Sequence, residues 1–413
     1  MAHLFLTRQI HTLWYNDTMP IVETAVALCA VGAEKVLSNE IRKLGFKVNE
    51  GGFGRVRFKT DLPGLYRALM GLRVADRLLL EIAWFEARDF DALFEGVRQQ
   101  PWEEYVAPHM GLRVAKVRTN RSVLAAETSI QAIVHKAAAE RICERRGINR
   151  LPEHTDAAEL RVYIEKDIVS VLLDLSGEPL FKRGYRTSGG IAPLRETTAA
   201  AIILHSGWRR KFSLYDPFCG SGTIAVEAAM YAWDIAPGLG RRFALEQLLP
   251  GDRDTEQRIR GELLEKVDFS RPVRIGGSDS DAAVVAAAQG NMERAIALTR
   301  GENSGTGNFH NSFPSFRVLP MEDASDPFDS APEDGPEGFI VTNPPYGRRL
   351  GDTESAERTY SEMGKLSRHF PGWKLVLITD HPGFESFFGR KADSCREITN
   401  GAIRSYLYQY EKL

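Results

Sequence analysis

A glycine-rich segment, Asp-Pro-Phe-Cys-Gly-Ser-Gly-Thr at 216–223, lies between two apolar runs of different character. The run before it, 212–215, is short like a buried strand, and the run after it, 223–233, has the alanine content and spacing of a helix. Gly220 and Gly222 permit main-chain conformations that other residues rarely adopt. Strand, glycine-rich turn and helix in this order are typical of doubly wound α/β sheets, which bind ligands at the carboxyl ends of their strands. The segment therefore predicts a ligand site at such an edge.

Helices and strands alternate around this segment, from about residue 193 to the end of the chain. The other predicted elements are helices at 196–205, 281–296 and 356–368, strands at 273–276, 316–319, 339–342 and 374–379, and a terminal hairpin at 395–399 and 402–410. This alternation predicts a mainly parallel, doubly wound sheet. Two segments rich in Gly, Ser, Pro and Asp, 301–311 and 326–338, are predicted to be surface loops.

A second motif, Asn343-Pro344-Pro345-Tyr346, follows the predicted strand at 339–342. An exocyclic amine on a purine is a poor nucleophile because its lone pair is delocalised into the ring. The Asn343 side chain and the Pro344 carbonyl can accept hydrogen bonds from both N–H groups of such an amine, which favours a pyramidal nitrogen with an available lone pair. The prolines stiffen the loop, and Tyr346 can stack on the base and hold it for in-line attack. The motif predicts chemistry on a planar amine that needs neither a metal nor a covalent nucleophile.

Acidic residues near later strand ends indicate a nucleoside-bearing cofactor. Asp279 ends the strand after the glycine-rich segment, where a carboxylate can accept hydrogen bonds from both ribose hydroxyls. Asp281 is predicted to cap the next helix, and Asp323 could accept a hydrogen bond from an adenine amino group. With the amine-binding motif, these features indicate transfer of a methyl group from S-adenosylmethionine (SAM) to nitrogen. The candidate cofactor-binding residues in the glycine-rich segment are Asp216, Phe218, Gly220, Gly222 and Thr223.

Composition restricts the other classes of function. The 413 residues are too many for one ordinary core, and the 43% hydrophobic and 26% charged content is typical of a soluble globular protein. The four cysteines are scattered without a Cys-x-x-Cys pair, which argues against disulfides or structural zinc, so no metal is predicted and a reducing cytoplasm is expected. Residues 1–18 lack the features of a signal peptide and are interpreted as a flexible extension. No apolar run is long enough to span a bilayer, so no membrane partner is expected.

The first half of the chain predicts an α+β module. Its elements are a strand at 21–30, a helix at 33–44, a hairpin at 48–58, a helix at 62–72 and a strand at 76–84, then a helix at 90–98, a strand at 112–118, a helix at 129–146 and a hairpin at 160–175. The first five form a ferredoxin-like unit. Although the net charge is −2, residues 109–150 contain nine Lys or Arg and three acids, a typical footprint for a phosphate backbone. A glycine-rich stretch at 184–190 is predicted to join the two parts.

Further strings make the chain resemble the free-standing bacterial THUMP-domain RNA guanine-N2 methyltransferases, which are related to the N-terminal half of the rRNA enzyme RlmL. They are Gly184-Tyr-Arg, Ala192-Pro-Leu-Arg-Glu-Thr-Thr-Ala-Ala200, Gly207-Trp208, Ala236-Pro-Gly-Leu239 and Asn400-Gly401, with Trp102-Glu103, 116–121 and 129–136 in the THUMP-like part. The Asn-Pro-Pro-Tyr motif resembles that of class I methyltransferases. The resemblance covers roughly 21–413. Two departures are the missing aromatic residue at 246–250 and the long loop at 301–311.

The resemblance implies a Rossmann-like class I SAM-dependent methyltransferase domain at 184–413, after a ferredoxin-like domain at 19–84 and a THUMP RNA-binding domain at 85–183. It implies methylation of a guanosine N2 amine in structured RNA, with 23S rRNA as the favoured partner, at an unpaired or flipped nucleotide. Thr197 joins the cofactor candidates, and the candidate RNA contacts are Arg113, Lys116, Arg118, Arg121, Lys136, Arg183 and Arg186.

Several alternatives stay open at this point. A tRNA target is compatible with the same module. Adenine-N6 methylation of nucleic acid and glutamine methylation of release factors use the same tetrapeptide, and the basic first half argues against both. An RNA-binding or assembly protein without activity is a further alternative, against which the complete set of motif residues argues. The sequence does not indicate an oligomeric state.

Overall fold

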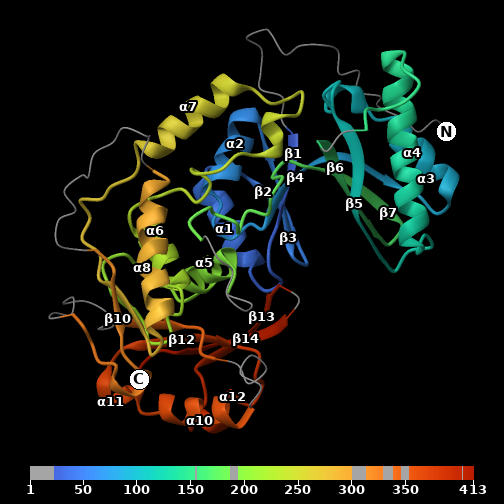
Figure 1. Ribbon diagram of the computed structural model, residues 1–413. Coiled ribbons are helices and arrows are strands. Elements are labelled where there is room, and N and C mark those ends of the chain that lie inside the picture. The colour runs from blue at the N-terminus through green and yellow to red at the C-terminus, as the bar shows by residue number, and fades with distance from the viewer. Residues whose placement is uncertain are drawn as a thin grey trace.

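The computed structural model describes residues 23–153, 156–186, 194–299, 313–328, 338–345, 353–401 and 403–413. Within these ranges the chain forms two seven-stranded sheets, one in each half of the sequence (Figure 1). The predicted fold class, an α+β part followed by a Rossmann-like α/β part, is confirmed. The predictions for the extension at 1–18, the loop at 301–311, and most of the stretches at 184–190 and 326–338 lie outside the described residues.

The first sheet has the strand order β2-β3-β1-β4-β7-β6-β5. Its strands are β1 (Glu23–Leu28), β2 (Val48–Gly52), β3 (Arg55–Thr60), β4 (Arg77–Glu86), β5 (Gly111–Asn120), β6 (Ala157–Glu165) and β7 (Ile168–Asp174). Neighbouring strands are antiparallel except β5 and β6. β4 pairs with β1 on one side and with β7 on the other, so one sheet crosses the predicted domain division, which falls within β4.

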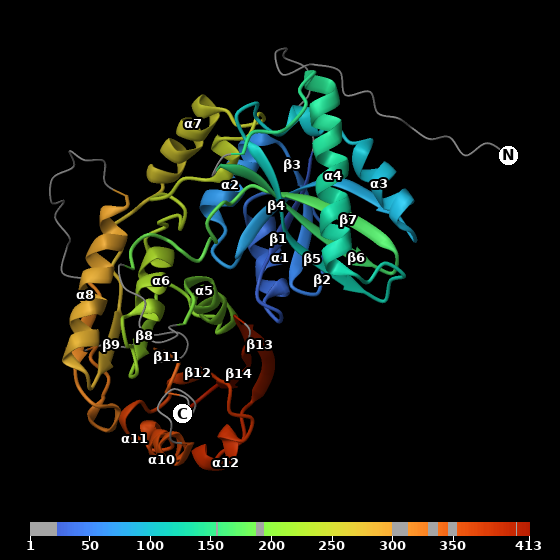
Figure 2. The same ribbon diagram turned by 45° about the vertical axis from the view of Figure 1, so that its right-hand side comes forward.

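Four helices cover one face of this sheet. They are α1 (Glu34–Lys43), α2 (Leu62–Gly71), α3 (Phe90–Arg98) and α4 (Glu127–Arg146), and a 3-10 turn, η1 (Trp102–Glu104), lies between α3 and β5. Figure 2 shows α3 and α4 beside β6 and β7. Alternate strand residues such as Ala25 and Leu80, which are paired across β1 and β4, are buried in the core beneath these helices. The predicted elements of this half are confirmed, with small shifts at their ends.

The second sheet has the strand order β10-β9-β8-β11-β12-β14-β13. Its strands are β8 (Ser213–Asp216), β9 (Ile275–Asp279), β10 (Ser315–Val318), β11 (Gly338–Thr342), β12 (Lys374–Thr379), β13 (Ser394–Asn400) and β14 (Ile403–Tyr410). The strands from β10 to β12 are parallel, and the β13–β14 hairpin joins β12 in antiparallel orientation. The predicted mainly parallel sheet is confirmed.

Helices lie on both sides of the second sheet. The helical segments of this half are α5 (Glu196–His205), α6 (Thr223–Ala232), η2 (Ala244–Glu246), α7 (Arg253–Leu264), α8 (Ala282–Ala297), η3 (Met321–Asp323), α10 (Thr353–Met363), α11 (Leu366–His369) and α12 (Phe384–Phe388). Figure 1 shows α10, α11 and α12 across the sheet from α5, α6 and α8. The helix predicted at 356–368 is divided at Gly364, where a Cβ atom would lie 2.8 Å from the Phe388 carbonyl oxygen. α7 and α12 were not predicted.

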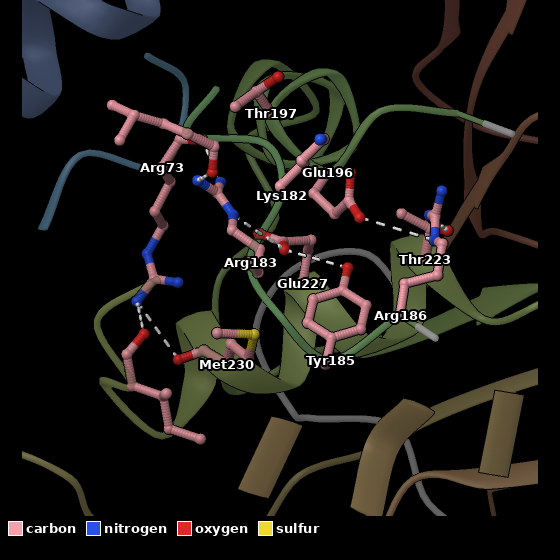
Figure 3. A network of polar contacts seen from close by, with 12 residues as sticks. Arg73, Lys182, Arg183, Tyr185, Arg186, Glu196, Thr197, Thr223, Glu227 and Met230 are labelled. Carbon is pink, nitrogen blue, oxygen red and sulfur yellow. Dashed lines mark hydrogen bonds and ion pairs between the residues drawn. The ribbon is translucent and has the colours of Figure 1, made fainter. Parts of the chain in front are cut away.

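A buried polar junction connects the two halves (Figure 3). Arg73 follows α2, and its guanidinium donates hydrogen bonds to the carbonyl oxygens of Met230 and Ile235, at 3.3 and 2.7 Å, near the end of α6. Arg183 lies in the connection between the sheets, and its Nε is 3.4 Å from a carboxylate oxygen of Glu227 in α6. Only 8% of Arg73, 2% of Arg183 and 1% of Glu227 is exposed. Buried charges of this kind need partners, so the junction ties the first half to the helix that carries the glycine-rich turn.

Candidate functional site

A cleft of about 1230 Å³ lies at the carboxyl edge of the second sheet. Asp216 at the end of β8, Asp279 at the end of β9 and Asn343 just after β11 all line this cleft. Arg358 and Thr359 of α10 line it from the other side of the sheet edge. The structure thus brings the glycine-rich segment and the Asn-Pro-Pro segment together in one cavity, as expected for parallel strands that end at a common edge.

Three glycines shape the turn between β8 and α6. Gly220 and Gly222 have φ angles of +50° and +79°, which favour glycine. A Cβ atom on Gly222 would lie 2.8 Å from the Cβ of Ala288, and one on Gly277 in β9 would lie 2.7 Å from the Cβ of Cys219. Side chains at these positions would push the turn off its neighbours. Gly277 was missed in the sequence, although a glycine inside a strand often marks such a close approach.

Asp279 connects this turn to β9. One carboxylate oxygen accepts a hydrogen bond from the Gly220 N–H at 3.0 Å, and the other accepts from the Asp281 N–H at 3.1 Å. A carboxylate can accept about four hydrogen bonds, so Asp279 keeps capacity for ribose hydroxyls in the cleft. Asp281 caps α8 by accepting from the Ala283 N–H at 2.8 Å, which confirms its predicted role.

Asp216 links the two motifs directly. Its Oδ1 accepts a hydrogen bond from the hydroxyl of Thr342 at 2.6 Å and from the Phe218 N–H at 3.1 Å. Thr342 is the last residue of β11, immediately before Asn343. Burial, with a smaller contribution from the nearby Asp279, raises the pKa of Asp216 to about 7, against the lowering effect of these two hydrogen bonds. A carboxyl group poised in this way can ionise when a cationic group enters the cleft.

We expect the cofactor-free protein to lose stability as the pH rises from about 4 to about 7, because over this range the unfolded chain ionises Asp216 while the folded protein keeps it protonated. Its folded-state pKa is raised, so its contribution is fully present below pH ~4 and is lost near pH 7. The Asn side chain of Asp216→Asn cannot ionise. Over that interval the free energy of unfolding of the wild type should therefore fall by up to about 4 kcal/mol more than that of the variant. Urea denaturation of both proteins across this pH range measures the difference. Parallel curves would show that Asp216 titrates normally.

The Asn-Pro-Pro segment is held from two sides. Pro344 is buried, and the carbonyl oxygen of Pro345 accepts a hydrogen bond from the Tyr360 hydroxyl of α10 at 3.3 Å. The same hydroxyl lies 3.1 Å from the hydroxyl of Thr379 at the end of β12. Tyr360 was missed in the sequence because nothing local shows that α10 returns to this loop. The predicted stacking residue, Tyr346, lies outside the described residues.

Some predicted cofactor contacts lie elsewhere. Phe218 and Thr223 line the cleft, as expected. Asp323 is exposed and does not line it, whereas the neighbouring Glu322 does. Thr197 is buried, does not line the cleft, and donates a hydrogen bond of 2.5 Å to the carboxylate of Asp76 in the first half. Thr197 is therefore positioned to hold the two halves together, and this corrects its predicted role as a cofactor contact.

The predicted RNA contacts on β5 are accessible. Arg113, Lys116 and Arg118 belong to this edge strand, and Arg121 follows it with a positive φ of 49°. About 64% of the Arg113 side chain and 58% of the Arg118 side chain is exposed. These side chains are therefore available to a large partner.

Two other predicted RNA contacts are internal. Arg183 donates to the Leu180 carbonyl oxygen at 2.7 Å and pairs with Glu227 in the junction. Arg186 donates to the Thr223 hydroxyl at 2.5 Å, with 13% of its side chain exposed. The structure corrects both predictions, because these guanidinium groups are bonded inside the protein and cannot reach a phosphate backbone without breaking the junction.

Within the described ranges, no group of three or more His, Cys, Asp or Glu side chains could hold a metal ion. No helix in this part of the chain is long and apolar enough to cross a membrane.

The groups around the cleft fit SAM. The glycine turn exposes backbone beside the cleft, the Asp279 carboxylate can accept from ribose hydroxyls, and Asp216 can face an ammonium group. Family models give independent support. A model described as the RMKL-like methyltransferase domain matches residues 183–302 and 327–409, and one described as the RlmL ferredoxin-like domain matches residues 24–79.

Individual relatives agree with these models. YpsC of Bacillus subtilis strain 168, a candidate RNA methyltransferase, is 35% identical over 389 residues, which cover 94% of this chain and 95% of YpsC. Ribosomal RNA large subunit methyltransferase K/L of Cellvibrio japonicus strain Ueda107 is 33% identical over 404 residues, 93% of this chain but 50% of that protein. The chain therefore spans about half the length of K/L. The crystal structure of SMU.472, a candidate methyltransferase in complex with SAH, has a TM-score of 0.82 and 34% identity, covering 96% of this chain and 99% of that one.

Proposed function

The chain belongs to the RlmL-like methyltransferases, and we propose that it methylates the exocyclic N2 amine of a guanosine in structured RNA, with 23S rRNA as the favoured target. The observation that carries the chemistry is the position of Asn343. Asn343 lines the same cleft as the glycine-rich turn, and its neighbour Thr342 is hydrogen-bonded to Asp216 at the start of that turn. An amine acceptor and a cofactor cradle in one cavity are what methyl transfer to nitrogen requires.

Several residues near the cleft have separate roles in this reaction. SAM, when bound, supplies a methyl group on a positively charged sulfur. The Asn343 side-chain oxygen and the Pro344 carbonyl accept the two N–H groups of the target amine and hold its lone pair toward the cofactor side of the cleft. Tyr360 anchors the loop through the Pro345 carbonyl, and the Thr342–Asp216 hydrogen bond fixes its distance from the glycine turn. The surplus proton can leave to solvent after transfer, so no strong base is needed.

The choice of RNA is supported by the relatives and by the first half of the chain. K/L of Cellvibrio japonicus is named for ribosomal RNA, and YpsC is named for RNA. The basic strand β5 provides accessible Arg113 and Arg118 for phosphates. We propose that residues 85–183 act as a THUMP RNA-binding domain, after a ferredoxin-like domain at 19–84 and before the methyltransferase domain at 184–413.

Nucleoside mass spectrometry of purified rRNA and tRNA from a deletion strain tests this proposal. We expect N2-methylguanosine to decrease in 23S rRNA and to return when the purified enzyme and SAM are added. Loss of N6-methyladenosine instead would reject the guanine assignment. A decrease confined to tRNA would reject 23S rRNA as the target, and unchanged nucleosides in all fractions would reject RNA methylation.

A further inference from the structure

The first sheet is covered by helices on one face only, within the part of the chain that the structure describes. Helices α1 to α4 pack on the face that contains Ala25 and Leu80. On the other face, Val26, Leu79 and Leu172 form a small separate cluster of strand residues. One solvated face is common in antiparallel sheets and carries no conclusion alone. The side chains that surround this cluster are what distinguish it.

Cations and aromatic rings form cross-strand rows on this open face. Arg118 of β5 is paired with Tyr163 of β6, and Trp84 of β4 lies in the same row across β7. The next row places Lys116 beside Arg161. Trp84 is 64% exposed, although a side chain of this size is normally buried. Cations beside an exposed aromatic ring are typical of surfaces that bind nucleic acid.

A groove of about 1010 Å³ runs along this face. Among the residues that the structure describes, seven Lys and Arg line it, against two acids, Asp76 and Glu165. Four carboxylates of described residues pair with these cations at 3.5 Å or less: Glu165 with Arg55, Glu127 with Arg118, Asp76 with Arg195, and the buried Asp174 with both Arg77 and Arg161. Seven cations against four acids leave a positive surplus in the groove. Such a concentration of positive charge attracts a phosphate backbone.

The surroundings of Lys116 reflect this positive charge. Its pKa is lowered, first by burial and then by the neighbouring Arg118 and Arg161. A phosphate placed among these three cations would relieve their repulsion.

Three aromatic side chains in the described ranges line the groove, and one of them, Phe53, is exposed for base stacking. Phe53, at the tip of the β2–β3 hairpin, lines the groove and is 83% exposed. Tyr163 lines the groove floor under Arg55, whose guanidinium carbon is 5.6 Å from the ring centre. Phe181 also lines the groove and lies under Arg195, at 4.7 Å. Base stacking on such rings tolerates any sequence.

The groove ends beside the methyl-transfer cleft. Arg195 lines the groove, and the adjacent residue, Leu194, lines the cleft. We propose that this groove binds an unpaired stretch of the RNA substrate and leads it toward Asn343, an inference that rests on the proposed function. Phosphates pair with Lys116, Arg118 and their neighbours, while bases stack on Phe53. Lys136, predicted as an RNA contact, lies on α4 on the opposite face of the sheet and therefore outside the groove.

A pair of matched double variants tests the groove. Arg55→Gln with Arg121→Gln removes two charges from it, and Arg145→Gln with Arg150→Gln removes two charges from the exposed end of α4 and the loop after it. The probe is a fluorescein-labelled RNA of about 12 nucleotides without secondary structure, a length that a single-strand groove can hold. Anisotropy titrations at several salt concentrations give the affinity and its salt dependence.

We expect the groove variant to bind about tenfold more weakly, with a salt slope reduced by about 1.4, whereas the control variant binds like the wild type. Phe53→Ala should weaken binding by about tenfold with an unchanged slope, because it removes stacking and no charge. Unchanged thermal unfolding midpoints establish that the variants are folded.

Three results would contradict the proposal that this groove binds unpaired RNA. Equal weakening by both double variants would show that the RNA does not bind in the groove. Tighter binding of a blunt duplex of the same sequence would show that the groove does not select unpaired RNA. Neither result would contradict the proposed methylation. A wild-type protein that binds no RNA probe would reject the RNA substrate itself, and the groove with it.

Discussion

Asn343→Ala is expected to reduce methyl transfer by about 10²–10³-fold or more while leaving the affinities for SAH and RNA nearly unchanged. Asn343 lines the cleft and follows the last residue of β11, so its side chain can accept a hydrogen bond from the target amine without belonging to the glycine turn that holds the cofactor. Its loss should therefore appear in the rate of the chemical step and not in binding. Single-turnover kinetics with labelled SAM, together with calorimetry of SAH binding, separates the two.

Asn343→Asp is the matched control. It keeps an acceptor oxygen at the same place. Aspartate also occurs at this position in class I methyltransferases, whose motif is Asn/Asp-Pro-Pro-Tyr, so part of the activity should remain. Full activity in Asn343→Ala would reject the role of this residue. A large loss of SAH affinity in either variant would instead show that Asn343 supports the cofactor cleft.

Much of the site could be predicted because it depends on strand order and local pattern. Asp216 and Asn343 were expected at one edge since each follows a short apolar strand, and parallel strands share their carboxyl edge. The hydrogen bond from Thr342 to Asp216 could not be predicted in the same way. It depends on the register of β11 against β8, in which Ile340 is paired with Tyr215, and register is a property of the folded sheet.

The roles of the basic residues were harder to predict than the roles of the motif residues. Arg118 and Arg183 look alike as basic residues in the sequence, yet 58% of one side chain is exposed and only 2% of the other. Burial of Arg183 follows from the docking of two halves whose contact surfaces have no local signature. Groove residues such as Arg55 were missed for a related reason. Side chains of β3 and β5 line one groove only because both strands belong to the same continuous sheet.

The buried junction therefore deserves a stability test of its own. Arg183 pairs with Glu227, which also accepts a hydrogen bond from the Tyr185 hydroxyl at 3.2 Å (Figure 3). Glu227 lies in α6, one turn after Thr223, which lines the cleft. Removing the cation would leave the Glu227 carboxylate buried without its closest positive partner, and an uncompensated charge in that position is among the most costly defects a single change can produce.

Arg183→Met should accordingly lower the free energy of unfolding by about 3–5 kcal/mol, as measured by urea denaturation with SAH absent. Adding Glu227→Gln should restore much of that loss, since the double variant contains neither charge. The exposed pair Arg258 and Glu262 of α7, whose nitrogen and oxygen are 2.8 Å apart, provides the comparison, and Arg258→Met should cost less than about 1 kcal/mol. If Arg183→Met cost no more than Arg258→Met, the Arg183–Glu227 pair would not stabilise the connection between the halves.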